Sequence, residues 1–189
     1  GVHRATRRLG IDVLAGVHGD RLILVLGGVH EPELIAERLA AQFGEGPITV
    51  GPITPSLAEA GASARAALSG HRAAVAWPDA PRPVSSGQLL AERALAGDTE
   101  ARRILRIDVF SALERAGGSL LTTMDSFIAT GGVLEGTARA LFVHPNTIRY
   151  RMRRVAEVTG FSPFVAHDAF TLRVALAIGR LDPTRDVIR

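Results

Sequence analysis

The first half of the chain alternates short aliphatic runs, which predict strands, with segments whose apolar residues recur at helical spacing. Gly19-Asp20 separates two of the aliphatic runs and predicts a hairpin turn. Pro32 and Pro55 suit the first turn of a helix, and Thr54 is a candidate N-cap. The expected elements are strands at 11–17, 21–26, 48–53 and 73–77, and helices at 32–43 and 55–68.

After residue 85 only helical patterns remain. Glycine pairs at 117–118 and 131–132 and Gly160 mark the expected ends of helices. The last helix carries Phe170, Val174, Ile178 and Leu181 on the face that we expect to be buried. The expected helices are 88–95, 98–116, 119–130, 134–141, 145–159 and 168–181.

This order of elements predicts an α/β domain with one sheet, followed by an all-α domain. We expect the α/β domain at 1–84, connecting helices at 85–118 and the all-α domain at 119–189. The apolar runs are too short to cross a bilayer and no signal peptide is present, so we expect a soluble cytoplasmic protein without membrane contact. Because the chain begins with Gly1, we expect a fragment of a longer protein.

The positive charge is concentrated toward the C-terminus. All 22 basic side chains besides histidine are arginines, and the formal net charge is +3. Residues 1–116 hold 13 arginines against 13 acids, whereas residues 117–189 hold 9 against 6. The whole excess therefore lies in the expected all-α domain, which indicates a polyanionic partner.

The segment HPNTIRYRMRR at 144–154 concentrates unusual chemistry. It contains the only asparagine and the only tyrosine of the chain, with four arginines and no acid. Two short helices joined by a tight turn, the second one basic, are typical of a helix-turn-helix. Its expected core is Ala138, Leu141, Val143, Ile148, Met152 and Val155, which turns Asn146, Arg149, Tyr150 and Arg153 outward.

The outward row has the functional groups that read bases. Arg149 and Arg153 can donate bidentate bonds to guanine, and Asn146 can pair with adenine. Tyr150 either joins them or packs on the preceding helix. The expected phosphate contacts are His144, Thr147, Arg151 and Arg154, helped by free backbone N–H groups at 145–147.

Two of the phosphate assignments have an alternative within the domain. Arg151 has the alternative of bonding to carbonyls inside the domain, and His144 has the alternative of capping the helix.

These residues carry a resemblance to a known family. The stretch 120–160, above all FVHPNTIRYRM at 142–152, resembles the C-terminal helix-turn-helix of the PucR/CdaR family of bacterial transcription regulators. The first half resembles, more weakly, the degenerate GGDEF-like domain that precedes it in CdaR-like members. The resemblance implies double-stranded DNA as partner and a response to small metabolites through a separate N-terminal sensor region.

Catalytic and metal chemistry find little support in the sequence. At the place of the Gly-Gly-Asp/Glu-Asp/Glu-Phe motif the chain has only LGGVH at 26–30, so cyclase chemistry is not expected. His3, His18 and His30 have no metal-ligand spacing, and cysteine is absent. We expect neither a metal nor a cofactor.

The sequence therefore predicts a sequence-specific DNA-binding regulator, not an enzyme. One helix-turn-helix reads a short site, so we expect a homodimer or a larger assembly, with the GGDEF-like domain and the 98–116 helix as candidate contact surfaces. Its effector is unknown. Two alternatives are a dimerisation or partner-docking module without DNA binding, and a nucleotide-cyclase relative.

Overall fold

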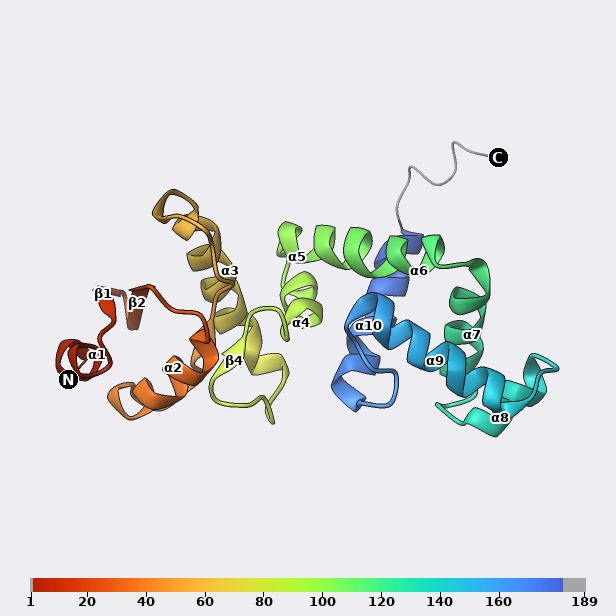
Figure 1. Ribbon diagram of the computed structural model, residues 1–189. Coiled ribbons are helices and arrows are strands. Elements are labelled where there is room, and N and C mark those ends of the chain that lie inside the picture. The colour runs from red at the N-terminus through yellow and green to blue at the C-terminus, as the bar shows by residue number, and fades with distance from the viewer. Residues whose placement is uncertain (1, 182–189) are drawn as a thin grey trace. The chain divides into compact units, whose positions relative to one another are not determined.

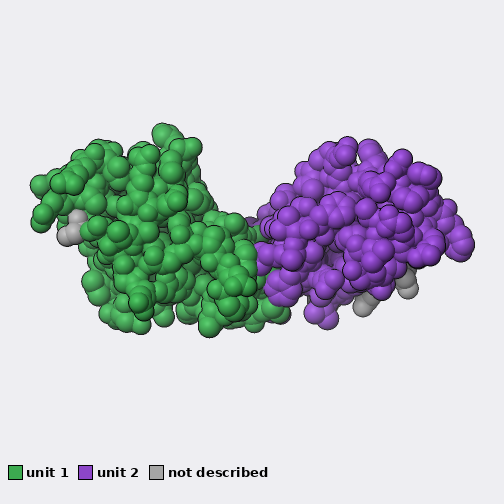
Figure 2. All heavy atoms as spheres, turned by 90° about the horizontal axis from the view of Figure 1, so that it is seen from below, with its two compact units in different colours: residues 1–98 green, residues 99–189 purple. Residues whose placement is uncertain are grey.

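The computed structural model describes residues 2–181 (Figure 1). The chain divides into two compact units, Gly1–Asp98 and Thr99–Arg189 (Figure 2). Unit 1 mixes helices with short strands and the described part of unit 2 is helical, which confirms the predicted fold class. The domain limits at 84 and 118 stay predictions.

The described part of unit 1 contains eight helices and strands and three short 3-10 turns. The sequence pattern does not predict the first helix, whose seven residues have no apolar period. The elements are α1 (Val2–Arg8), β1 (Asp12–His18), β2 (Arg21–Gly27), α2 (Pro32–Leu39), β3 (Thr49–Val50), α3 (Ala60–Ala73), β4 (Val84–Ser85) and α4 (Leu90–Leu95), with 3-10 turns at Ala40–Gln42, Leu57–Glu59 and Ala74–Ala76.

The predicted hairpin is present. β1 pairs with β2 in antiparallel register from Asp12 opposite Gly27 to His18 opposite Arg21, so Gly19 and Asp20 form the turn. Gly19 has a φ of +62°, which glycine adopts without strain. The hairpin is one of two two-stranded sheets among the described residues, so the single sheet predicted from the sequence is wrong.

The second sheet differs from the prediction in its strands. β3 is only two residues long and runs parallel to β4, with Thr49 opposite Val84. The strand predicted at 73–77 is wrong, because Ala73 ends α3 and the next three residues form a 3-10 turn. The apolar run at 73–77 is too short for its pattern to distinguish a strand from a helix. Ala73 and Ala74 are neighbours and both are buried, which fits the helical backbone found there.

The start of α3 also differs from the prediction. The N-cap assigned to Thr54 is wrong, since the 3-10 turn Leu57–Glu59 begins after Ser56 and α3 begins at Ala60. Ser56 Oγ donates to Glu59 Oε1 at 3.1 Å, and this bond stabilises the turn. Thr49 Oγ1 donates to the carbonyl of Ala67 at 2.9 Å and ties β3 to α3.

Unit 2 is built from helices in its described part. The prediction of one long helix at 98–116 matches a continuous helical run, but its centre is a π-helix, η4. The elements are α5 (Thr99–Ile104), η4 (Leu105–Phe110), α6 (Ser111–Arg115), α7 (Gly118–Ala129), α8 (Leu134–Ala140), α9 (Pro145–Thr159) and α10 (Ala166–Arg180). Within residues 2–181, no helix combines the length and hydropathy that a bilayer crossing requires.

The buried face of α10 is not the one that the sequence predicts. Phe170 and Leu181 are exposed and Val174 and Ile178 are half-buried, whereas Leu172, Leu176 and Gly179 are buried. Both stripes of this helix are apolar, so the period alone does not separate them. Gly179 determines which stripe is buried, because a Cβ at this position would collide with the ring of Phe110 in η4.

Candidate nucleic-acid interface

Helices α8 and α9 form a helix-turn-helix, and both helices pack against α7. Ile148, Met152 and Val155 of α9 are fully buried, and Ala138 of α8 is small where the two helices meet. Leu141 and Val143 in the turn are partly buried. The inner face of α9 is thus fixed by packing against α6, α7, α8 and η4, and its outer face is left to solvent.

The turn between the two helices is a Schellman motif. The N–H of Phe142 donates to the carbonyl of Arg139 at 3.2 Å, and the N–H of Val143 donates to that of Ala138 at 3.0 Å. The motif requires one residue in the left-handed backbone conformation, and Phe142 adopts this conformation with a φ of +54°. This residue is 96% exposed.

The N-terminus of α9 is capped by His144. Its Nδ1 accepts from the backbone N–H of Asn146 at 3.2 Å, and its carbonyl accepts from the N–H of Thr147 at 2.9 Å. The expectation of free backbone N–H groups at 145–147 is therefore wrong, since Pro145 has none and the next two are bonded. Because Nδ1 accepts, the proton of the neutral imidazole lies on Nε2.

The four residues predicted to read bases are all exposed on α9: Asn146, Arg149, Tyr150 and Arg153. Tyr150 is 66% exposed, so its ring is accessible. Arg149 Nη1 donates to Asn146 Oδ1 at 2.8 Å, and its Nη2 lies 3.9 Å from Glu135 Oε1 of α8. The guanidinium and the amide therefore form one bonded pair on the outer face.

The arginines at the edges of this face have different partners. Arg151 Nη1 donates to Thr123 Oγ1 of α7 at 3.0 Å, so this side chain is held inside the domain. Arg154 Nη1 lies 3.0 Å from Glu157 Oε2 in an exposed pair. Within residues 2–181, Arg153 has no ion pair or side-chain hydrogen bond.

Sequence reasoning missed two partners on neighbouring helices, Glu135 and Thr123. Both belong to other helices, and no spacing along the sequence reports a contact across helices. A weak signal was present for Glu135, because it is the only acid between Asp125 and Glu157.

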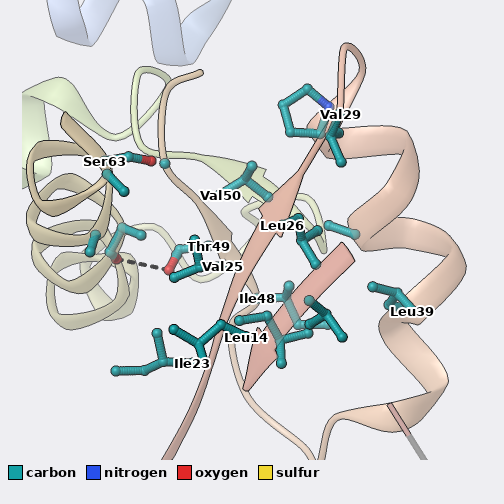
Figure 3. Close-up of a pocket in the computed structure, with 18 of the residues that line it drawn as sticks. Leu14, Ile23, Val25, Leu26, Val29, Leu39, Ile48, Thr49, Val50 and Ser63 are labelled. Atoms are coloured by element: carbon teal, nitrogen blue, oxygen red, sulfur yellow. Dashed lines mark hydrogen bonds between the residues drawn. The ribbon is translucent and has the colours of Figure 1, made fainter. Parts of the chain in front are cut away.

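Unit 1 holds a cavity of about 940 Å³ with a mixed apolar and polar lining (Figure 3). It lies between the hairpin, α2, β3 and α3, and most of the labelled side chains around it are aliphatic. Among residues 2–181, no group of three or more His, Asp or Glu side chains could hold a metal ion.

Comparison with known proteins matches both units. Residues 120–178 match the PucR C-terminal helix-turn-helix domain, and residues 1–73 match a GGDEF-like domain. The crystal structure of a regulator of polyketide synthase expression from Bifidobacterium adolescentis is similar at a TM-score of 0.81 and 36% identity. The match covers 98% of this chain and 74% of that one. This chain belongs to the PucR/CdaR family of transcription regulators.

Curated relatives align with almost the whole of this chain. Uncharacterized proteins of Mycobacterium tuberculosis and Mycobacterium bovis are each 42% identical to this chain over 182 residues. The aligned region is 96% of this chain and 44% of each relative, so the chain spans less than half the length of these curated relatives.

Proposed function

We propose that this chain binds double-stranded DNA in a sequence-specific way, by placing α9 in the major groove. One observation supports this most strongly. The inner face of α9 is buried in the domain, while its outer face carries the lone asparagine and two arginines of the notably basic segment 144–154. A helix fixed on one side and rich in planar hydrogen-bonding groups on the other suits base readout.

Three side chains are the proposed readers of base edges. Arg149 and Arg153 donate to guanine O6 and N7, and Asn146 pairs with the N6 and N7 edge of adenine. The bond between Arg149 and Asn146 limits the rotamers of both groups before DNA arrives. Tyr150 is the fourth proposed contact, because its exposed ring lies on the same face.

The proposed phosphate contacts flank this row. His144 can donate from Nε2 while its Nδ1 caps α9, and Thr147 and Arg154 offer a hydroxyl and a guanidinium. We assign Arg151 instead to holding α9 on α7 through Thr123, since that bond uses its guanidinium inside the domain. This revises the expectation that Arg151 contacts a phosphate.

Promoter control by a single short helix requires more than one copy. We propose a homodimer that reads two half-sites about one helical turn apart. We further propose that the complete protein responds to a small metabolite through a region outside this chain, as the family resemblance implies. The mechanism is binding, without a catalytic step.

A binding titration with charge-matched variants tests the proposal. We expect the Arg149→Ala/Arg153→Ala variant to bind a selected duplex about 30-fold or more weakly, because two bidentate contacts are lost. Fluorescence anisotropy measures the affinity. The Arg102→Ala/Arg173→Ala variant loses the same charge from exposed positions on other helices and should bind almost normally. Equal losses in both variants, or no binding by the unaltered chain, would contradict base readout by α9.

A phosphate contact by Arg154 has a different signature. We expect Arg154→Gln to weaken binding to all duplexes alike and to reduce the slope of log K against log salt by about one unit. Titrations at several salt concentrations give this slope. Arg173→Gln is the control, since it removes one charge from α10. An unchanged slope for Arg154→Gln would show that Arg154 contacts no phosphate.

A further inference from the structure

Phe142 combines two unfavourable features in the free protein. It is the one non-glycine residue with a positive φ among residues 2–181, and the residue is 96% exposed. A bulky side chain in the left-handed region strains the backbone. The exposed ring gains no burial in return, so nothing in the free fold accounts for phenylalanine at this position.

The preceding turn shows what the fold alone requires. The end of α7 is a Schellman motif with the same bonds, from Gly131 to the carbonyl of Ile128 and from Gly132 to that of Phe127. There the left-handed residue is Gly131, with a φ of +67°. Gly131 and Phe142 thus occupy equivalent positions, and the strained one lies next to the proposed DNA-binding helix.

The neighbours of Phe142 indicate what its ring meets. Two residues later, His144 caps α9, and Asn146 begins the proposed base-reading row. Phe142 therefore lies at the end of α9 whose first residues contact base edges in a helix-turn-helix. This end has exposed histidine, asparagine and arginine side chains, which suit DNA better than an apolar protein surface.

We infer that Phe142 is a DNA-contacting residue, whose ring packs on apolar C–H surface of the duplex beside the N-terminus of α9. This inference rests on the proposed function. Two sources of such surface lie within reach in the groove, the 5-methyl group of thymine and the deoxyribose. The backbone strain is retained because only a residue with a large apolar side chain makes this contact.

A series of substitutions separates the ring from the backbone. Phe142→Gly relieves the strain and removes the ring, so we expect a higher melting temperature together with about tenfold weaker binding to the selected duplex. Phe142→Ala removes the ring and keeps the strain, so it should bind as weakly without the gain in stability. Phe142→Tyr keeps the ring and should bind almost normally.

The DNA can be varied to identify the source of the contact. Replacing thymine by deoxyuridine in the selected duplex should weaken the unaltered chain but not Phe142→Gly, if the ring meets a methyl group. The contact is assigned to the sugar if the unaltered chain binds the thymine and deoxyuridine duplexes equally and Phe142→Gly still shows the tenfold loss of affinity.

The opposite results are equally clear. Unchanged affinity of Phe142→Gly and Phe142→Ala, with sensitivity to Arg149→Ala retained, overturns the inference and leaves the proposed function intact. In that case, a sedimentation coefficient of Phe142→Gly that differs from that of the unaltered chain would assign the ring to a contact between two copies of the chain. Failure of the unaltered chain to bind any duplex overturns both.

Discussion

Replacing Arg149 by alanine should cost about 1 to 3 kcal/mol of binding free energy on a selected duplex and relax base preference at one position in each half-site. The reason is the loss of a bidentate donor from the exposed face of α9. Titration against duplexes that differ at single positions measures the effect. An equal loss on every sequence would mean that Arg149 contacts phosphate and reads no base.

The bond between Arg149 and Asn146 sharpens this prediction. Because Arg149 Nη1 donates to Asn146 Oδ1 at 2.8 Å, each side chain helps to position the other. We expect Arg149→Ala and Asn146→Ala to be non-additive, so that the double variant loses less than the sum of the single losses. Additive losses would show that the two groups contact DNA independently.

Replacing Met152 by alanine should destabilise unit 2 by about 2 to 5 kcal/mol. Met152 is fully buried at the centre of the face that fixes α9, and alanine leaves a cavity there. The matched control is Tyr150→Ala, two residues away on the exposed face, which should change stability by no more than about 0.5 kcal/mol.

The chain carries separate probes for this measurement. The lone tryptophan, Trp77, packs against the core of unit 1, while the lone tyrosine lies in unit 2. Urea unfolding followed by Trp77 fluorescence should be unchanged in Met152→Ala, whereas circular dichroism should show an earlier transition for unit 2. An equal shift of both signals would contradict the assignment of Met152 to the core of unit 2 alone.

The ends of α9 were predictable to the residue, and the reasons are local. Pro145 suits the first helical position, and Gly160 is left-handed at the C-terminus, with a φ of +76°. Between them the apolar residues recur at a clear helical period. The hairpin was predictable for the same kind of reason, since its turn and both strands are continuous in the sequence.

The parts that could not be predicted depend on contacts between distant segments. β4 is two residues long and forms only because Val84 and Ser85 meet β3, more than 30 residues away, as the register shows. The buried stripe of α10 is set by Phe110 of η4, not by the sequence of α10. Such outcomes follow from tertiary packing, which overrides local pattern.

The candidate site also has a part that was predictable from the sequence and a part that was not. The outward row of α9 follows from the helical period, but the partners of its arginines do not. Arg151 bonds to Thr123, 28 residues earlier, and Arg149 lies near Glu135 of another helix. The sequence indicated which residues face outward, and only the structure separates Arg151 from the exposed row.

Selection of duplexes from a random pool by the purified chain tests the central claim that α9 reads base sequence. We expect enrichment of a short motif, repeated at a spacing of about one helical turn if two copies bind. In the same selection, Arg149→Ala should lose preference at one position of each half-site. Binding without any enriched motif, or a motif that Arg149→Ala and Asn146→Ala leave unchanged, would contradict the account.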